Sequence, residues 1–481
     1  MQKHRLVISL VLIMILSLSC KILVPEATAT PVDVTETSVV TEPVASETPP
    51  APTNTPVPAG LNPTRPYIVY GGTSGIWISN PDGSFLTKIT DLDIGLHDLR
   101  RLISPQGDRV AVIVANDQGL DLVEVKIPGG ETKTIAHLFS ITPDELSSNP
   151  LNAKAFATYA IRDYDNIAWQ PGDGKLLAFM GAINDPTSDL YVYNVESGEI
   201  TQLSSGPTQA VFPTWSPDGN YVLYYGVNWK GPFGGAIGGH NQLKSVWASR
   251  ISDEKVIKQA TPKSVALPFV GWQDESHYIT YDQDETCSAK NLRSVNVETG
   301  KATPIADLSF YSYIDLSPEN GSLLFSGAPG CPDSPGEGIF LLPSGQTTPT
   351  KLADKRAWEI RWMPESKVFF AYPEALFSSD GSTRYDPPVY DKSFQPAVSQ
   401  KGYQAWEVIE NQQGRVEVKV PGADWQKILD GSVEQLTWDP FNGETLLIVL
   451  KDGSLYAASY PDFTPREMGK AEGVNQIIWL P

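Results

Sequence analysis

The stretch that decides the fold runs from Trp215 to Gly219 and has the sequence WSPDG, with the run YVLYY following from Tyr221 to Tyr225. Pro, Asp and Gly specify a tight turn, and an apolar aromatic run bounded by such a turn is typical of a β-strand. The pattern returns roughly every forty to fifty residues, which indicates an internal repeat. Weaker copies begin at Ile103, Trp169, Trp272, Leu316, Trp362, Val398 and Trp438, and a last anchor, Trp479, stands near the end of the sequence.

Each repeat continues beyond its turn as a series of short strands. In the copy that begins at Trp169 a strand from Leu190 to Asn194 is followed by a turn and by another strand from Ile200 to Leu203. The repeat is therefore predicted to be a four-stranded antiparallel meander. A single meander has two unpaired edges and an apolar face that it cannot cover, and radial stacking of the units removes most of both.

The two ends of the repeat region complement each other. The first unit, with strands at Tyr67–Tyr70 and Gly75–Asn80, lacks an innermost strand, and the segment Val474–Leu480 is a strand without a unit after it. Their pairing closes a ring. We therefore predict an all-β fold, a single β-propeller of eight or nine four-stranded blades, with Thr142–Arg162 as its one helical insertion.

The W-S-P-D-G turn and the strand ending G-(I/L)-(W/Y)-(I/V)-x-N resemble the repeats of TolB-type propellers and of the dipeptidyl-peptidase IV N-terminal propeller. The resemblance covers nearly all of the predicted folded part and implies the same architecture. It says little about function, because the turn shapes each blade. The TolB family has a mixed α/β domain before its propeller, whereas this chain has a Pro-rich stretch there. The peptidase family adds an α/β-hydrolase domain, but no G-x-S-x-G elbow occurs in this sequence.

The first nineteen residues are predicted to be a signal peptide, since Lys3 and Arg5 precede an apolar run from Leu6 to Leu16. Small residues before Cys20 resemble a bacterial lipobox, which implies that Cys20 is lipidated. Ser17 stands where that motif favours leucine, so ordinary cleavage or a retained anchor remain alternatives. We expect an exported protein, lipid-anchored to the outside of a bacterial membrane, either the cell membrane or the outer membrane.

Residues 20–63 are rich in Pro and Thr and cannot bury a core. We expect a disordered linker that holds the propeller, residues 64–481, away from the membrane; a processing remnant is the alternative. The formal charge of the chain is −20, and removal of Lys3 and Arg5 with the signal takes it to −22. This acidity disfavours nucleic acid and anionic lipid as partners, so membrane contact should come from the lipid anchor alone.

Two cysteines remain after Cys20. Cys287 and Cys331 occupy the loop between the second and third strands of neighbouring units, and such loops emerge on one face of a propeller. We predict that they form a disulfide, as an oxidising compartment permits, with two free thiols as the alternative. So few thiols and five scattered histidines disfavour zinc, and no metal or other cofactor is expected.

Long loops on one face are the predicted recognition surface. The Gly-rich loop from Gly226 to Lys244 and the insertion before Trp169 both contain aromatic residues with a few polar ones, a combination that suits peptide or sugar binding. The competing explanation is that these rings pack the loops against the blades. The candidate binding residues are Trp229, Lys230, Phe233, His240, Tyr159, Arg162, Asp163 and Tyr164.

Two acidic groups were considered as sites for chemistry. Asp282, Asp284 and Glu285 alternate as in a calcium loop but lack its glycine, so a solvated acidic turn is the better account. The second group could supply acid, base and ligand atoms at the central channel, although scattered surface residues are the commoner explanation. It consists of Asp91, Asp93, His97 and Asp98.

No set of residues in the sequence defines a catalytic site. We therefore expect a monomeric binding or scaffolding module for an envelope protein, peptide or glycan. The alternative is a propeller-type hydrolase or lyase that acts on extracellular glycan or peptide. An enzyme would gather two carboxylates, or a histidine and a carboxylate, at a pocket by the channel, whereas a binding module would present a broad aromatic and polar surface.

Overall fold

The computed structural model describes residues 57–62, 64–94, 97–142, 144, 153–162, 165–184, 186–229, 241–263, 267–284, 288–390 and 392–480. They belong to one compact unit that extends from Asn54 to Pro481. The predicted signal peptide and most of the predicted linker, including Cys20, lie outside the described residues. None of the helices in the described part of the chain combines the length and the apolar character that a membrane crossing requires.

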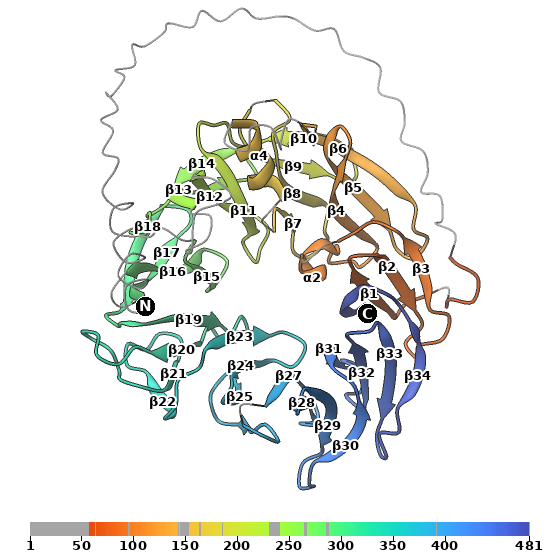
Figure 1. Cartoon of the computed structure of the whole chain (residues 1–481). Coiled ribbons are helices and arrows are strands. Elements are labelled where there is room, and N and C mark those ends of the chain that lie inside the picture. Colours follow the sequence, from red (N-terminus) through yellow and green to blue (C-terminus); the bar gives the residue numbers. More distant parts are fainter. Residues whose placement is uncertain are drawn as a thin grey trace, which may run out of the picture. The chain divides into compact units, whose positions relative to one another are not determined.

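The described chain folds into antiparallel meanders, called blades here, that follow one another around a ring (Figure 1). Within a blade the strands are numbered first to fourth from the centre of the ring outward. The first strands are β35 (Val474–Leu480), β7 (Ile167–Trp169), β11 (Gln209–Trp215), β15 (Phe269–Trp272), β19 (Phe310–Leu316), β23 (Glu359–Met363), β27 (Ser393–Val398) and β31 (Val433–Trp438). The second strands are β1 (Tyr67–Gly72), β4 (Arg109–Asn116), β8 (Leu176–Gly181), β12 (Tyr221–Trp229), β16 (His277–Asp284), β20 (Leu323–Gly327), β24 (Val368–Tyr372), β28 (Gln404–Glu410) and β32 (Thr445–Leu450).

The outer half of each blade is built in the same way. The third strands are β2 (Gly75–Ser79), β5 (Gly119–Lys126), β9 (Asp189–Asn194), β13 (Asn241–Arg250), β17 (Ser288–Asn296), β21 (Ile339–Leu342), β25 (Ala375–Ser378), β29 (Gln413–Lys419) and β33 (Ser454–Ser459). The fourth strands are β3 (Thr87–Thr90), β6 (Thr132–Ser140), β10 (Ile200–Gln202), β14 (Lys255–Lys258), β18 (Lys301–Ala306), β22 (Thr350–Ala353), β26 (Arg384–Tyr385), β30 (Gln426–Asp430) and β34 (Arg466–Lys470).

These strands make nine blades in the described part of the chain. Blade 1 contains β35, β1, β2 and β3, blade 2 contains β4, β5 and β6, and blades 3 to 9 follow in chain order from β7–β10 to β31–β34. Blades 5 and 6 share one eight-stranded sheet, because Ala289 of β17 pairs with Phe310 of β19. The β-propeller fold is thus confirmed, and the number of blades lies within the predicted eight or nine.

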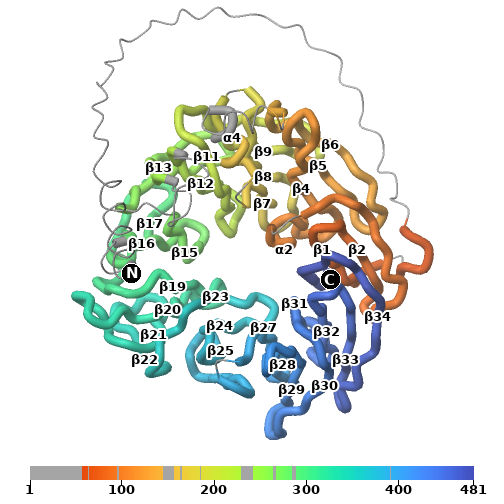
Figure 2. Tube along the Cα trace, in the orientation of Figure 1, coloured from red at the N-terminus to blue at the C-terminus, as the bar shows by residue number. Residues whose placement is uncertain are grey.

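The first blade joins the two ends of the repeat region, as predicted. Tyr67 pairs with Leu480 and Ile68 with Trp479, so β35 is the innermost strand of the sheet that β1 begins. Strand β35 also contacts β31 of blade 9 and the segment at the centre of blade 2. Both views of the trace show the first and last blades side by side in the ring (Figures 1 and 2).

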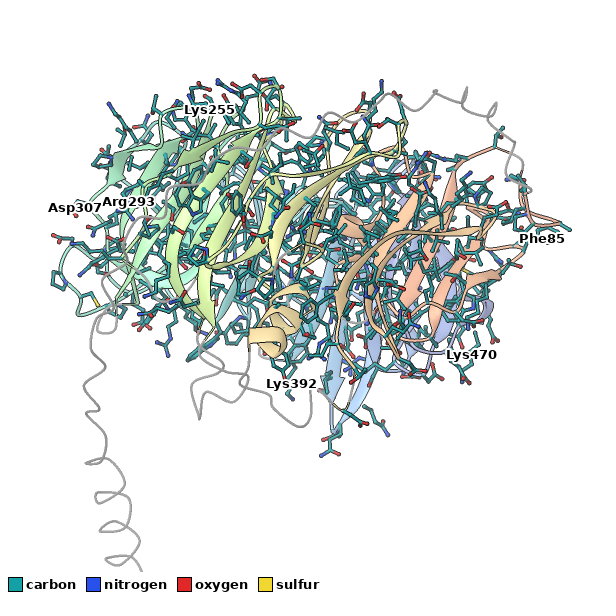
Figure 3. All side chains as sticks on the ribbon, turned by 90° about the horizontal axis from the view of Figure 1, so that it is seen from above. Phe85, Lys255, Arg293, Asp307, Lys392 and Lys470 are labelled. Atoms are coloured by element: carbon teal, nitrogen blue, oxygen red, sulfur yellow. The ribbon has the colours of Figure 1, made fainter. Side chains whose placement is uncertain are left out.

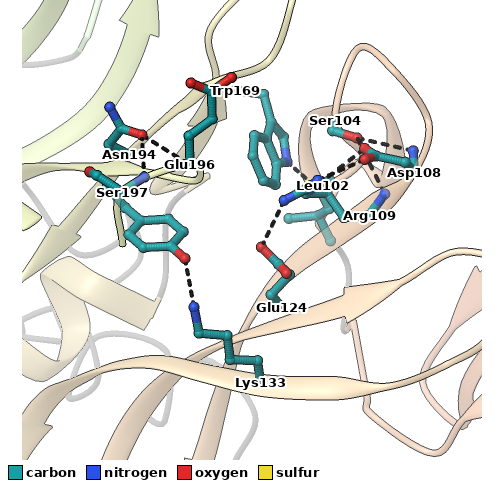
Figure 4. A network of polar contacts seen from close by, with 11 residues as sticks. Leu102, Ser104, Asp108, Arg109, Glu124, Lys133, Trp169, Asn194, Glu196 and Ser197 are labelled. Carbon is teal, nitrogen blue, oxygen red and sulfur yellow. Dashed lines mark hydrogen bonds and ion pairs between the residues drawn. The ribbon is translucent and has the colours of Figure 1, made fainter. Parts of the chain in front are cut away.

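The recurrent tryptophans lie between blades. Trp169, Trp215, Trp438 and Trp479 are buried, whereas Trp272 and Trp362 are half-buried. In three blades the indole N–H donates to a backbone carbonyl one residue before the preceding blade's anchor. These bonds run from Trp169 Nε1 to Leu102 O at 2.7 Å (Figure 4), from Trp215 Nε1 to Ala168 O at 2.7 Å and from Trp438 Nε1 to Ala397 O at 3.2 Å. The tryptophans that anchor the repeats therefore make contacts between blades.

The W-S-P-D-G turn explains why the repeat needs its particular residues. Ser216 Oγ donates to Asp218 at 2.5 Å and accepts from Tyr221 N at 3.0 Å, which ties the turn to the strand after it. Gly219 has φ of +71°, and a Cβ there would lie 2.8 Å from Cγ of Gln170 in the turn of blade 3. The turn therefore closes its own blade and packs on the preceding one.

Blade 2 differs from the prediction of four strands in every unit, because it lacks the first, innermost strand. The residues before Ile103 form a one-turn helix, α2 (Leu99–Leu102), and Ile103 itself makes only an isolated bridge to Val110. Asp98 caps the helix by accepting from Arg100 N at 3.0 Å, and Leu99 and Leu102 are buried. A local cap and a run of helix-favouring Leu and Arg thus override the repeat. Within the predicted insertion, α4 (Ala153–Arg162) is helical.

The indole hydrogen bond can be tested at Trp215. Substitution Trp215→Phe keeps an aromatic ring between blades 3 and 4 but leaves the buried Ala168 carbonyl without its donor, so the free energy of unfolding should fall by about 1–3 kcal/mol. Denaturant unfolding monitored by circular dichroism measures the change. The same substitution at Trp358, which is 52% exposed, should change stability by less than about 0.5 kcal/mol. Equal effects at both positions would contradict the role of the bond.

Candidate functional site

The propeller presents two faces that differ in their connections. Because neighbouring strands are antiparallel, the loops between second and third strands and the connections from one blade to the next all emerge on one side, the connection face. The turns between first and second strands and between third and fourth strands emerge on the opposite side, the turn face. Cys331 and the strand ends that flank the predicted recognition segments lie on the connection face.

The Gly-rich recognition segment is shorter than predicted. Strand β12 extends to Trp229, which pairs with Asn241 at the start of β13, so Trp229 ends a strand instead of lying within a loop. The predicted binding residues Lys230, Phe233 and His240 lie outside the described residues.

The second recognition segment is the insertion that contains α4. Tyr159 on this helix is only 8% exposed, and the guanidinium of Arg162 lies 5.4 Å from the centre of its ring. Packing of the ring, the competing explanation, therefore describes Tyr159 better than ligand contact. Asp163 and Tyr164 lie outside the described residues.

An exposed aromatic cluster occupies the connection face of blades 6 and 7. Tyr311 and Tyr313 stand on β19 with ring centres 6.2 Å apart, and Arg356 precedes β23. The Arg356 guanidinium lies 4.0 Å from the ring centre of Trp358 and 5.4 Å from that of Tyr311, and it donates to the Tyr311 hydroxyl at 3.1 Å. Trp358 is 52% exposed and Tyr313 39% exposed.

The cluster continues into blade 8. Lys355, next to Arg356, places its ammonium 3.8 Å from the ring centre of Tyr390, which is 37% exposed and precedes β27. Tyr311, Tyr313, Lys355, Arg356, Trp358 and Tyr390 together are named the aromatic platform. Aromatic rings with intervening cations are the composition of binding surfaces, because each ring offers a large rigid contact area and each cation a directed interaction.

Sequence reasoning missed the platform because its residues stand in ordinary repeat positions. Tyr311 and Tyr313 belong to a strand that was expected to be an inner wall, and Trp358 stands four residues before the anchor Trp362. The sequence YSY at Tyr311–Tyr313 could have indicated it. Successive side chains of a strand point to opposite sides, so two tyrosines two residues apart share one side, and not every side of an innermost strand is buried.

An open channel at the centre of the ring has a volume of about 550 Å³ and is lined from blades 1, 2, 3, 7, 8 and 9. Its charged lining residues are Asp98, Asp165, Glu365, Glu434, Arg100 and Arg361. Gln395, also on the wall, has φ of +43°, a strained conformation for a residue with a side chain. The buried Oδ1 of Asn475, on the same wall, has no hydrogen-bond partner among the described residues.

Helix α2 gives the channel wall two arginines. Arg100 forms an ion pair with Glu365, which follows β23 in blade 7. Arg101 donates to Asp165 O at 3.3 Å and to Pro213 O at 3.0 Å, and thereby connects blade 2 with blades 3 and 4. The helix therefore replaces the backbone pairing of a strand with side-chain bonds across the ring.

The predicted acidic group around His97 does not converge. Nδ1 of His97 hydrogen-bonds Oδ1 of Asp165, a residue of blade 3, at 3.2 Å, whereas Asp98 caps α2 and Asp91 pairs with Lys88. Asp93 and His97 line a cavity of only about 10 Å³, which is the size of one water molecule. A substrate does not fit into this cavity. The hydrogen bond between His97 and Asp165 instead connects blades 2 and 3.

The expectation of a solvated acidic turn is wrong for Asp282. Strand β16 continues through this residue, whose side chain is buried and accepts from Arg293 at 2.7 Å and Asn291 at 2.9 Å. Paired in this way, the carboxylate has a lowered pKa although burial alone would raise it. No group of three or more potential ligands for a metal ion occurs within the described ranges.

Comparisons with known proteins give similarity at the level of the fold. No protein-family model matches the sequence, and no curated protein matches it significantly. The structure is similar to that of TolB from Acinetobacter baumannii, with 12% identity over 76% of this chain and 80% of that chain and a TM-score of 0.30. It is also similar to dipeptidyl peptidase 4 from Porphyromonas gingivalis, with 8% identity over 84% of this chain and 59% of that chain and a TM-score of 0.44. An oligogalacturonate lyase from Vibrio parahaemolyticus is similar with 12% identity over 63% of this chain and 78% of that chain and a TM-score of 0.35. TolB and dipeptidyl peptidase 4 are the two families that the repeat resembles.

The contact between blades 2 and 3 should make stability sensitive to acid. The pKa of Asp165 is lowered, mainly by the hydrogen bond from His97 and further by Arg101, against the effect of burial. A carboxyl with a lowered folded-state pKa contributes stability above its unfolded pKa of about 3.9, and this contribution disappears as pH falls through the folded value. Melting temperatures between pH 7 and pH 2.5 should therefore fall less steeply for Asp165→Asn than for wild type. The exposed Asp117→Asn variant should follow wild type; identical slopes in all three would refute the contact's role.

The disulfide between Cys287 and Cys331 stays a prediction, because Cys287 lies outside the described residues. Asp333, two residues after Cys331, accepts from Ser309 N at 3.3 Å, and Phe310 pairs with Ala289, two residues after Cys287. We expect a peptide joined through Cys287 and Cys331 in a non-reduced digest analysed by mass spectrometry. Reduction, or a Cys331→Ser substitution, should lower the free energy of unfolding by about 2–4 kcal/mol. Alkylation of both thiols in the native, unreduced protein would contradict the pairing.

Proposed function

We propose that this protein is an exported, lipid-anchored β-propeller that binds an envelope protein, peptide or glycan on its connection face and does not catalyse a reaction. The observation that carries the proposal is the aromatic platform. Export and lipidation rest on the signal sequence and Cys20, and a disulfide between Cys287 and Cys331 would suit the same compartment.

The platform has the features of a binding surface. Trp358, Tyr313 and Tyr390 are three of the nine large apolar side chains exposed in the described residues, and they gather on consecutive blades. Exposed apolar residues scattered singly need no explanation, but a cluster points to interaction. Trp, Tyr and Arg are also the residues that contribute most to binding energy at interfaces.

The charge of the platform narrows the chemistry of the partner. The chain is acidic overall, with a net charge of −20, yet Lys355 and Arg356 are the charged members of the platform. A partner segment with a carboxylate or another anionic group beside an apolar or planar one would match this surface. Attraction of an anion by an otherwise acidic protein requires such a local cationic site.

A hydrolase or lyase function has weaker support. Among the described residues, His97 and Asp165 combine a histidine with a carboxylate near the channel. The cavity that they share is about 10 Å³ and does not admit a substrate, and of the two only Asp165 also lines the channel. Both members are engaged in contacts between blades. Structures similar to this one include enzymes as well as TolB, so they do not favour either class.

The platform can be tested by quantitative capture. The purified full-length propeller domain, immobilised on beads, is incubated with native envelope extract, and bound proteins and glycopeptides are quantified by mass spectrometry. We expect components enriched by the wild type to fall at least tenfold with Trp358→Ala, because truncation of a central aromatic residue typically removes about 2 kcal/mol or more.

The matched control is Phe85→Ala. Phe85 is 58% exposed, similar to Trp358, and it lies in the turn between β2 and β3 at the edge of the described structure (Figure 3). Its substitution should leave capture unchanged, and circular dichroism should verify that both variants are folded. If capture survives in a folded Trp358→Ala protein and in Tyr313→Ala, the platform is not the binding surface.

A further inference from the structure

A second concave site lies between blades 3 and 4, away from the platform. It is a groove with a volume of about 600 Å³, within the range of small-molecule sites. The connection from β10 to β11 lines one side, and strands β12, β13 and β14 line the other. The residues that supply its polar and aromatic surface are Asp189, Ser204, Thr208, Tyr224, Ser245 and Trp247.

A glycine keeps two hydroxyl groups of the groove within reach of each other. Gly226 on β12 carries no side chain, and a Cβ there would lie 2.4 Å from Ser245 Oγ and 2.7 Å from Thr208 Oγ1. Any larger residue would push one or both hydroxyls aside. Gly226 thus leaves room for two hydroxyls at one place on the wall, one from β13 and one from the connection before β11.

A buried carboxylate orients a hydroxyl group of the groove. Asp189, only 1% exposed, accepts from Ser204 Oγ and from Thr187 Oγ1, both at 3.1 Å. Ser204 Oγ in turn accepts from Leu190 N at 2.9 Å, which directs its hydrogen toward Asp189. Because Asp189 is buried, it acts on the groove through the Ser204 hydroxyl, which it orients so that a ligand hydroxyl can donate to Ser204 Oγ.

Aromatic residues form the rest of the wall. Trp247 is half-buried, and its indole Nε1 donates to Ser245 Oγ at 2.6 Å, so the ring is held in place. Burial raises the pKa of Tyr224 to about 12, so its hydroxyl stays protonated at any physiological pH. Fixed rings beside hydroxyl and carboxylate groups offer a stacking surface together with hydrogen bonds in several directions.

From this arrangement we propose that the groove binds a neutral polyhydroxylated ligand, a sugar residue in size and chemistry. Hydroxyl groups of a sugar can exchange hydrogen bonds with Ser204, Thr208 and Ser245, while the Trp247 ring covers an apolar face of the sugar. An anion would be repelled by Asp189, and a single carboxylate is too few ligands for a divalent cation. This site is separate from the aromatic platform, since the two share no residue.

Saturation-transfer NMR and calorimetry on the propeller test the proposal with defined probes. Glucose, galactose, mannose and N-acetylglucosamine are each added alone, and inorganic phosphate serves as the anionic probe. We expect at least one neutral sugar, and not phosphate, to bind the wild type. Its affinity should fall at least tenfold in Trp247→Ala and in Gly226→Ala, which fills the space between Ser245 and Thr208.

Trp425→Ala is the matched control. Like Trp247, Trp425 is half-buried and has a lysine over its ring, at 5.6 Å for Lys419 compared with 5.9 Å for Lys258 over Trp247. Sugar binding should be unchanged in this variant. If a groove variant does not fold, Ser245→Ala, which removes one hydroxyl and with it the acceptor of Trp247 Nε1, should weaken sugar binding as well.

The outcomes that overturn the proposal are distinct from those that concern the platform. Absence of binding by all four sugars, preference for phosphate, or undiminished binding in folded groove variants would each refute the groove as a sugar site. Loss of sugar binding in Trp358→Ala with retention in Trp247→Ala would assign the sugar to the platform instead. Partner capture by the platform is measured independently of all these results.

Discussion

The structure depends on a contact that crosses from one blade to the next. Trp169, Trp215 and Trp438 each fill the space between two blades and donate an indole hydrogen to a carbonyl of the neighbouring blade's innermost segment, which is helix α2 for Trp169 and a strand for the other two. The ring supplies buried apolar area, and the hydrogen bond fixes how far one blade is rotated against the other. A meander alone has an uncovered apolar face, so this contact is what makes a row of small sheets into one stable molecule.

Much of the fold could be predicted from the sequence because it follows from short-range patterns. The turn at Trp215–Gly219, the spacing of its copies and the orphan strand at Val474–Leu480 were sufficient for the propeller and its closure. The helix at Leu99–Leu102 was not predicted, since a single turn has no periodicity to detect and depends on the cap by Asp98. The insertion before β7 was located correctly, although the described helix occupies only its last part, Ala153–Arg162.

The candidate sites were harder to predict, because they arise where separate repeats meet. Loop length drew attention to Tyr159, which is buried, and away from Trp358 and Tyr390, which stand in short connections of normal length. The groove joins Asp189 of blade 3 to Trp247 of blade 4, residues that no local pattern relates. Asp282 was predicted to be solvated for the same reason, because the sequence does not show that Arg293 on the adjacent strand pairs with it.

Helix α2 has a consequence for anything that enters the central channel. Eight of the nine blades line the channel with a β-strand that runs in the same direction. If all nine were equivalent, a ligand in the channel could bind in many orientations of similar energy. The ninth wall is a helical turn whose Arg100 reaches across to Glu365 in blade 7. Helix α2 therefore breaks the rotational symmetry of the ring at blade 2, and its ion pair divides the channel opening into unequal parts.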